Sequence, residues 1–188
     1  LDNSTISEKV LLELCSAITE TPADAIIFSD FRHGMFNKVT IPALTDAIPS
    51  GMFRVADSQV ASRWGNILDF SGFDLITPNE KEARFALADQ DSGVRPLALD
   101  LFKESKAKTL VLKLGSRGII TYRSKRSGDY RAFFAIDSFT ENLVDAVGAG
   151  DALLAYSTLG MLVTGNEVIA SILASIPSSP AYKKNGNR

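Results

Sequence analysis

The sequence predicts an α/β layered domain whose sheet is mostly parallel and has an antiparallel edge. The first observation is that short apolar runs, typical of buried strands, alternate with segments of helical periodicity. The second is a pair of strand-like segments around the turn-rich stretch 125–129, which indicates a hairpin. The third is the composition of the 188 residues, 45% hydrophobic and 22% charged, which is typical of a globular domain rather than a disordered chain.

Helices are expected where apolar residues recur every three to four positions. Thr5 with Glu8 three residues later forms a capping-box pattern at the start of the first helix, and Pro22 ends it. Pro42 is tolerated in the first turn of the second helix, and Asn166 can cap the last one. In chain order, the expected helices cover residues 5–19, 40–48, 79–88, 96–105, 151–163 and 167–176.

Strands are expected where short apolar runs are bounded by turn residues. The continuous run 25–28 is typical of a strand buried on both faces, and the polar loop 29–34 follows it. Residues 109–114 carry the strongest strand signal in the chain. In chain order, the expected strands cover residues 25–28, 53–56, 73–76, 109–114, 119–123 and 130–136.

The charge balance and the single cysteine exclude several classes of protein. The sequence has 20 basic and 22 acidic side chains, so no positive surplus indicates nucleic acid or an anionic membrane as a partner. The apolar stretch 152–163 is too short to span a bilayer, and no signal peptide is recognisable. Cys15 alone cannot form a disulfide framework, which fits a reducing cytoplasm, and its helical spacing predicts a buried core thiol.

The glycine-rich turn 148–150, between Asp145 and Asp151, is the most informative stretch for function. Glycines allow a close backbone approach, and the helix that follows has unpaired N–H groups in its first turn, so the turn can hold a phosphate. Asp151 can take a proton from an alcohol there, although an aspartate that simply caps the helix is an equally simple reading. No P-loop pattern occurs, and Leu153 stands where a dinucleotide fingerprint needs its third glycine.

Three ordered motifs resemble the ribokinase-like (PfkB) carbohydrate kinases. Residues 145–155, Asp-Ala-Val-Gly-Ala-Gly-Asp-Ala-Leu-Leu-Ala, resemble the family's C-terminal signature. Residues 77–83 resemble its Asn-x-x-Glu motif, and residues 112–118 resemble its Gly-x-x-Gly nucleotide loop. Within the family, residues 29–34 and 185–187 are most similar to the kinase half of the bifunctional heptose 7-phosphate kinase and ADP-heptose synthase.

The resemblance implies a role for each matching residue. Asp151 matches the catalytic base, and Gly148, Ala149 and Gly150 match the anion hole for the γ-phosphate of ATP. Glu82 with Asn79 matches the motif that organises Mg²⁺. Asp145 matches a residue that in some members helps to bind a monovalent cation, although Ala146 replaces the usual threonine beside it. The positions that match the lining of the nucleotide phosphates are Lys113, Gly115 and Gly118.

Each of these assignments also has a purely structural alternative. Asn79 and Glu82 form a complete capping box, and residues 115–118 read equally well as a plain strand-to-strand turn. His33, the single histidine, is expected to face solvent. Asp30 directly follows a buried strand, so its carboxylate can reach the crevice at the carboxyl edge of the sheet and contact substrate.

The resemblance implies a three-layer α/β/α ribokinase-like fold with its N-terminal part missing, so that residues 1–188 are a partial carbohydrate kinase domain. The implied activity is ATP-dependent phosphoryl transfer to a hydroxyl of a sugar or sugar phosphate, such as heptose 7-phosphate. One alternative is a nucleotide- or anion-binding fragment without transfer, and a more distant one is a dinucleotide-dependent oxidoreductase. Because the front strands are absent, we expect the chain either to self-associate, for example as a homodimer, or to leave its sugar crevice open.

Overall fold

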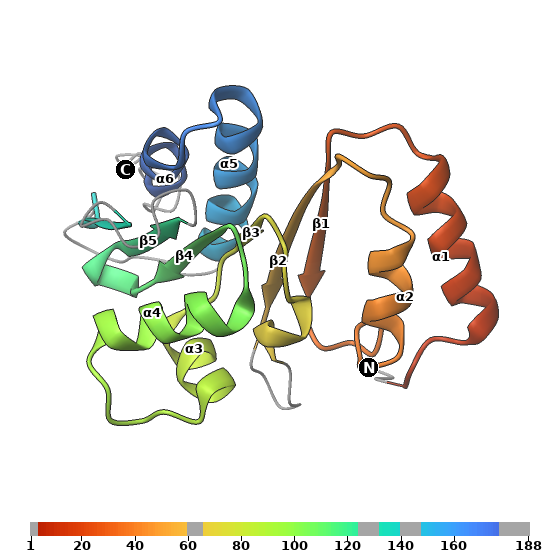
Figure 1. Cartoon of the computed structure of the whole chain (residues 1–188), viewed down its shortest axis with the longest axis horizontal. Helices are drawn as coiled ribbons and strands as arrows, with labels where there is room; N and C mark the ends of the chain where they lie inside the picture. The colour runs from red at the N-terminus through yellow and green to blue at the C-terminus, as the bar shows by residue number, and fades with distance from the viewer. Residues whose placement is uncertain (1–3, 60–65, 124–131, 140–147, 177–188) are drawn as a thin grey trace, which may run out of the picture.

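Six strands form a single sheet in the order β1-β2-β3-β4-β5-β6 (Figure 1). The structure is a computed structural model that describes residues 4–59, 66–123, 132–139 and 148–176. Strands β1 to β4 are parallel, and β4, β5 and β6 pair antiparallel. The strands are β1 (Ala25–Asp30), β2 (Phe53–Ser58), β3 (Leu75–Ile76), β4 (Thr109–Lys113), β5 (Ile119–Arg123) and β6 (Phe133–Ile136). The predicted mostly parallel sheet with an antiparallel edge is therefore confirmed.

The helices lie where the periodicity predicts them, with ends that shift by up to three residues. They are α1 (Glu8–Glu20), α2 (Thr40–Asp46), α3 (Glu80–Leu87), α4 (Val94–Ser105), α5 (Ala149–Thr164) and α6 (Glu167–Ser175). Two short 3₁₀ helices lie between consecutive strands: η1 (Ile67–Phe70) between β2 and β3, and η2 (Gly115–Arg117) between β4 and β5. The predicted cap at Thr5 is wrong, because Ser7 is the N-cap and its side chain accepts from the amide of Val10. The predicted cap at Asn166 is confirmed.

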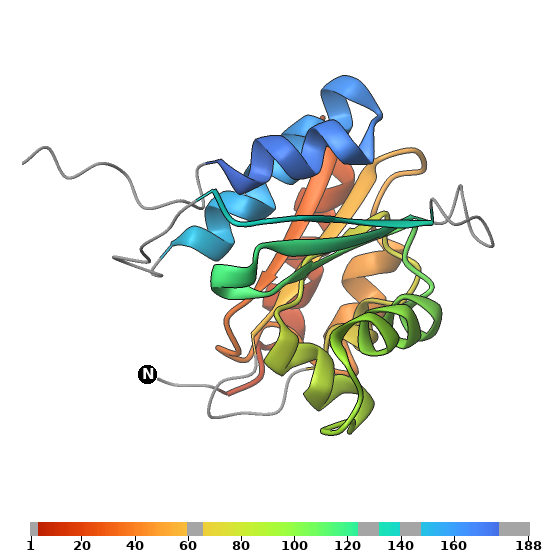
Figure 2. The same cartoon turned by 90° about the vertical axis from the view of Figure 1, so that its left-hand side faces the viewer.

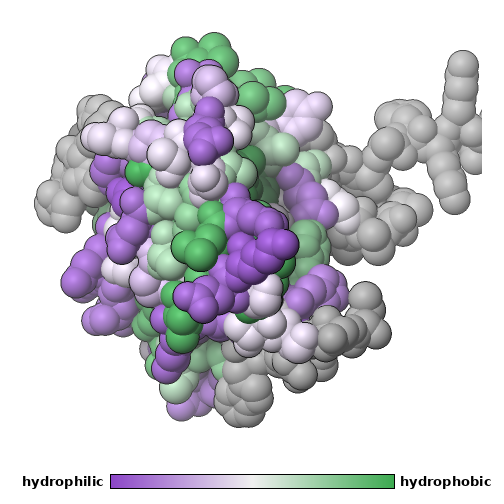
Figure 3. Space-filling view, turned by 90° about the vertical axis from the view of Figure 1, so that its right-hand side faces the viewer, coloured by the Kyte–Doolittle hydropathy of each residue, from purple (hydrophilic) through white to green (hydrophobic). Residues whose placement is uncertain are grey.

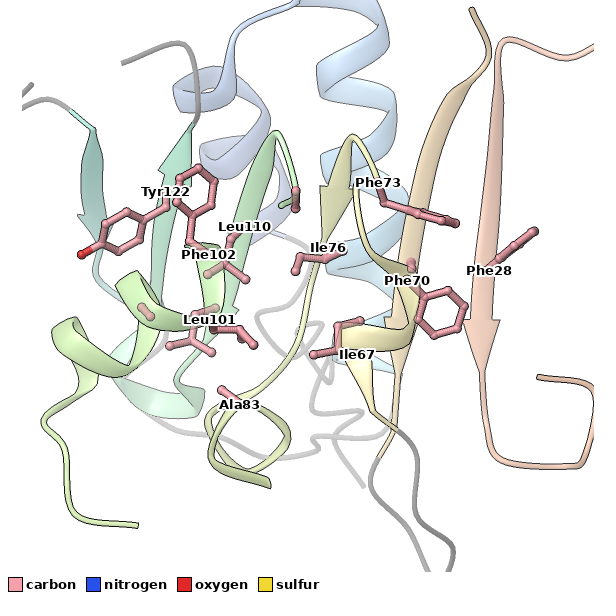
Figure 4. Close-up of a cluster of buried hydrophobic side chains, with 14 of the residues drawn as sticks. Phe28, Ile67, Phe70, Phe73, Ile76, Ala83, Leu101, Phe102, Leu110 and Tyr122 are labelled. Atoms are coloured by element: carbon pink, nitrogen blue, oxygen red, sulfur yellow. The ribbon is translucent and has the colours of Figure 1, made fainter. Parts of the chain in front are cut away.

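Helices α1 to α4 cover one face of the sheet, and α5 and α6 cover the other, which gives three layers (Figure 2). The larger core lies under α1 to α4 and is rich in aromatic residues (Figure 4). There the rings of Phe28, Phe70 and Phe73 meet with centroids 5.5–6.1 Å apart. Cys15 packs against this core, as predicted, but its burial is only partial.

The smaller core lies under α5 and α6. Its sheet side chains Val55, Leu75 and Val111 pack against Leu153 and Leu154 of α5. The two helices themselves approach closely: a Cβ added at Gly160 would lie 2.7 Å from the Cα of Ala170. This approach keeps the two helices together as a single layer over the centre of the sheet.

Part of the apolar surface remains uncovered. On α5, on α6 and at the C-cap of α6, seven large apolar side chains are at least 40% exposed: Tyr156, Leu159, Val163, Ile169, Ile172, Leu173 and Ile176. Of the strands that the structure describes, β1 is the last one on its side of the sheet, and its Ile27, on the α5 face, is 41% exposed. On the side of the molecule that carries α1, hydrophobic residues also reach the surface between hydrophilic ones (Figure 3). Among the described residues, no helix combines the length and apolarity needed to cross a bilayer.

Candidate functional site

The carboxyl ends of the parallel strands place a row of polar side chains at one edge of the sheet. Side chains alternate between the two faces of a strand, so Asp57 shares a face with Val55, and Lys113 shares it with Val111. Val55 and Val111 belong to the small core under α5, and the polar residues therefore continue that apolar face outward. Thr77 directly follows β3 between them. These polar side chains therefore lie next to the part of the sheet face that α5 covers.

These three side chains form one hydrogen-bonded cluster. The hydroxyl of Thr77 donates to Oδ1 of Asp57 at 3.1 Å, and Nζ of Lys113 donates to the same oxygen at 3.0 Å. The side chains of Asp57 and Lys113 are only 5% and 15% exposed. Because the pair is largely shielded from water, it is stronger and better defined in geometry than an exposed ion pair.

The N-terminus of α5 lies against this cluster. Gly148 is the N-cap and has a φ of +81°, which favours glycine, and Asp151 is exposed in the first turn of the helix. A Cβ added at Gly150 would lie 3.6 Å from Nζ of Lys113, so the ammonium approaches the backbone of that turn. Free helix N–H groups and a cation together make this corner suitable for an anion.

Asn79 and Glu82 form the capping box of α3 beside the same edge. The amide and side-chain nitrogens of Asn79 donate to the two carboxylate oxygens of Glu82 at 2.7 Å each, and Oδ1 of Asn79 accepts from the amide of Glu82 at 2.9 Å. Asn79 also forms a β-bridge with Lys113, which ties α3 to the polar row. The structural reading of the motif is confirmed. Its role toward a metal ion stays a prediction.

The buried carboxylate of Glu82 fits Mg²⁺ held through water better than direct coordination, because both of its oxygens already accept hydrogen bonds. Among the described residues, no three acidic, histidine or cysteine side chains form a cluster able to hold a metal ion. A site with so few protein ligands suits Mg²⁺, which keeps several waters and is held largely by substrate phosphates.

The turn at residues 115–118 has the tight geometry that its two glycines predict. Gly115 has a φ of +62° and Gly118 a φ of +83°. A Cβ added at Gly118 would lie 2.0 Å from the carbonyl oxygen of Ile136, so the turn is pressed against the end of β6. The reading of residues 115–118 as a strand-to-strand turn is confirmed. Contact with nucleotide phosphates stays a prediction.

A charge network anchors this turn to α3. Glu80 accepts from the guanidinium of Arg84 at 2.7 Å and also pairs with Arg117 in the turn. Hydrogen bonds from Arg84, and secondarily from Arg117, hold the pKa of the Glu80 carboxyl below its usual range despite some burial. The turn at residues 115–118 and the N-terminus of α3 therefore keep a defined spacing.

The structure does not bring Asp30 to the cluster around Lys113. Asp30 is buried on the face that carries Phe28, under α1 to α4, whereas the cluster lies on the α5 face. Its carboxylate accepts from the amide of Arg32 at 2.8 Å and from the hydroxyl of Ser58 at 3.0 Å, and it also pairs with the Arg32 guanidinium. Asp30 thus orders the loop after β1. His33 is exposed, as predicted.

Asp145 lies outside the described residues. A cavity of about 560 Å³ lies at the opposite, amino edge of the sheet, near Arg54, Asp74 and Lys108. There Asp74 pairs with Lys108 at 2.6 Å and accepts from the amide of Arg54 at 2.7 Å, so the carboxylate at this cavity already has partners within the protein. The carboxyl edge of the sheet, where Lys113 lies next to the first turn of α5, is therefore the better candidate for the functional site.

Asp57 and Thr77 were missed by the sequence reasoning as site residues. The signal for Asp57 was present: a carboxylate that directly follows a predicted strand is the pattern that singled out Asp30. The sequence contained no comparable signal that Asp57 would bond to a lysine 56 residues further along the chain. That contact depends on the order of strands in the sheet.

Comparison with known proteins gives consistent results. The family model described as pfkB family carbohydrate kinase matches residues 22–173. The bifunctional protein HldE of Pelobacter propionicus is 28% identical over 167 residues, covering 87% of this chain and 32% of that protein. Phosphofructokinase-2 from Escherichia coli, in complex with potassium, superposes with a TM-score of 0.74 at 21% identity, covering 97% of this chain and 58% of that one. Arabidopsis thaliana ribokinase, complexed with ribose and ATP, superposes with a TM-score of 0.65 at 17% identity, covering 94% of this chain and 53% of that one.

Proposed function

The chain belongs to the pfkB family of carbohydrate kinases, and we propose that it takes part in ATP-dependent phosphoryl transfer to a hydroxyl of a sugar or sugar phosphate. The observation that carries the proposal is the convergence of Lys113 and the first turn of α5 at one corner of the sheet. A fixed cation beside free backbone N–H groups is suited to the charge that spreads over a transferring phosphoryl group.

In the proposed mechanism, Asp151 accepts the proton of the sugar hydroxyl, whose oxygen forms the new bond to the γ-phosphorus. The bond from that phosphorus to the bridging oxygen breaks, and ADP leaves. The backbone N–H groups at Gly148, Ala149 and Gly150 stabilise the phosphoryl oxygens throughout. The exposed position of Asp151 in the first turn of α5 leaves it accessible to an acceptor.

The proposal places Mg²⁺ at Glu82 and Asn79, through water, and the nucleotide phosphates near Lys113, Gly115 and Gly118. When bound, the metal ion would neutralise charge on the phosphates. A monovalent cation at Asp145 also belongs to the proposal, on the basis of the sequence resemblance and of the potassium complex of phosphofructokinase-2.

Heptose 7-phosphate is the specific acceptor that we propose, because HldE is among the similar proteins and the loop 29–34 resembles that subfamily. A second candidate function is binding of a nucleotide or another anion without transfer. It is favoured by one observation: the chain spans 53–58% of the two solved kinases and 32% of HldE. In that case the acceptor site would lie in a part of those proteins that this chain does not match.

Two measurements on the full chain separate these functions. Calorimetric titration with ATP measures binding, and a coupled assay measures ADP release with ribose, fructose 6-phosphate and heptose 7-phosphate as acceptors. Binding with acceptor-dependent release supports the kinase, whereas binding without release supports the binding module.

Replacing the proposed base gives a more specific test. Asp151→Asn should lower turnover roughly 10²–10⁴-fold, as loss of a general base does, with little change in ATP affinity. The matched control is Asp100→Asn, which changes an exposed aspartate on α4. Near-normal turnover of Asp151→Asn would contradict the assignment of this residue.

A further inference from the structure

We infer that Asp57 is a positioning residue, which fixes the ammonium of Lys113 beneath the first turn of α5 and so prepares the anion site. The inference rests on the proposed function, because it assumes that this corner binds the phosphates of a nucleotide. It concerns a residue that none of the three sequence motifs contains.

The first support is the distance that the lysine side chain has to span. Lys113 ends β4 and Asp57 lies near the end of β2, with β3 between them in the sheet. The Lys113 side chain nevertheless crosses to Asp57 and stays there with 15% of its surface exposed. A flexible lysine loses rotamer entropy when it is held in one orientation. Asp57 supplies the charge-assisted hydrogen bond that offsets this loss.

The second support is that Asp57 is itself held in place. Its Oδ1 accepts from Thr77 as well as from Lys113, and the residue is 4% exposed. Asp57 lies on β2, and Thr77 directly follows β3, which pairs with β2 at Val55 and Leu75. The amide of Thr77 also donates to the carbonyl oxygen of Ala56, so the backbone sets the separation of the two side chains. The ammonium is thereby fixed relative to rigid strands and not to a loop.

The third support is the position at which the ammonium of Lys113 is held. Nζ of Lys113 lies 3.6 Å from the position of a Cβ on Gly150, next to the backbone of the α5 first turn. A ligand that binds the free N–H groups of that turn therefore lies next to the ammonium. Without Asp57, the lysine would sample other rotamers, and the site would lose part of its order before the ligand arrives.

A double-mutant cycle on the full chain tests this inference. The variants are Asp57→Asn, which keeps an acceptor oxygen but removes the charge, Lys113→Met, and the two combined. Calorimetry measures the affinity for ATP and for adenosine, which lacks the phosphates. Each single change is expected to weaken ATP binding roughly tenfold, as loss of a charged hydrogen bond does, and to leave adenosine binding unchanged. The double variant is expected to match Lys113→Met, because Asp57 acts through that lysine.

The control pair uses Asp74→Asn, which changes another buried aspartate paired with a lysine, at the opposite edge of the sheet. Asp74→Asn alone is expected to leave ATP affinity at the wild-type value. Combined with Lys113→Met, it is expected to give the same ATP affinity as Lys113→Met alone. Thermal unfolding of every variant establishes that the compared proteins are folded at the assay temperature.

The outcomes separate the inference from the proposed function. ATP binding that follows the cycle, without ADP release to any acceptor, would support the role of Asp57 and refute the transfer activity. Turnover with an unchanged ATP affinity in Asp57→Asn would support the kinase and overturn the inference. Multiplicative effects in the double variant, or equal weakening of ATP and adenosine, would also overturn it, because both indicate a general structural role. A chain that binds no ATP would overturn both.

Discussion

Replacing Gly118 by alanine should destabilise the protein strongly, and the structure allows the size of the effect to be worked out. Its backbone has a φ of +83° and a ψ of −136°, a region essentially confined to glycine, and an alanine there costs about 1–3 kcal/mol. The new Cβ would also lie 2.0 Å from the carbonyl oxygen of Ile136 and 2.8 Å from two further backbone atoms. Displacing a strand end to relieve such overlap costs about 1–3 kcal/mol more. The expected total is about 4 kcal/mol.

Gly115→Ala is the matched control, because Gly115 lies in the same turn and also has a positive φ, of +62°. Nothing lies within 4 Å of a Cβ there, so only the backbone term remains, about 1 kcal/mol. Urea unfolding followed by circular dichroism gives both free energies of unfolding. Equal losses in the two variants would refute the claim that contact with the end of β6, and not the turn conformation alone, requires glycine at position 118.

Two further predictions concern the charge network and the uncovered surface. Because the pKa of Glu80 is lowered in the folded state, its ion pairs stabilise the protein above the unfolded pKa and lose that effect as pH falls through the folded pKa. The gap in unfolding temperature between the wild-type protein and Glu80→Gln should therefore be present at about pH 6 and shrink as the pH falls below the usual glutamate range; a constant gap would contradict this. The exposed apolar side chains of α5 and α6, with the edge strand β1, predict self-association, and sedimentation of a single monomeric species at all concentrations would refute it.

The local features of the fold were readable from the sequence because they depend on residues close together in the chain. Periodicity of 3.6 or 2 marks an amphipathic helix or a half-buried strand, and capping patterns mark helix ends. The cap at Asn166 and the capping box at Asn79 and Glu82 follow from such short patterns and are confirmed. The first helix shows the limit, because Thr5 and Ser7 offer competing caps. The chain uses Ser7.

The candidate site was readable only where its parts lie within a motif. The glycine turn before α5 and the Asn79 motif were recognised from consecutive residues. Asp30 and Asp57 lie at the carboxyl ends of the neighbouring strands β1 and β2, yet they point to opposite faces of the sheet. Side chains alternate between the two faces of a strand, and the one that points to the α5 face is the one that contacts Lys113. Which residues point to that face is decided by how the helices pack on the sheet.

The α/β class, the order of the helices and strands, and the glycine turns could all be predicted from the sequence alone. The sequence also showed that the three motifs resemble those of one family. The tertiary structure alone decided that Asp57, Thr77 and Lys113 share one face, that the ammonium of Lys113 lies beneath α5, and that Asp30 lies on the other face, where it accepts from Ser58. The physical reason is that helical periodicity, turns and caps are set by interactions over a few residues. Strand order, register and facing are set by burial of the whole chain, which brings together groups 20 to 56 residues apart.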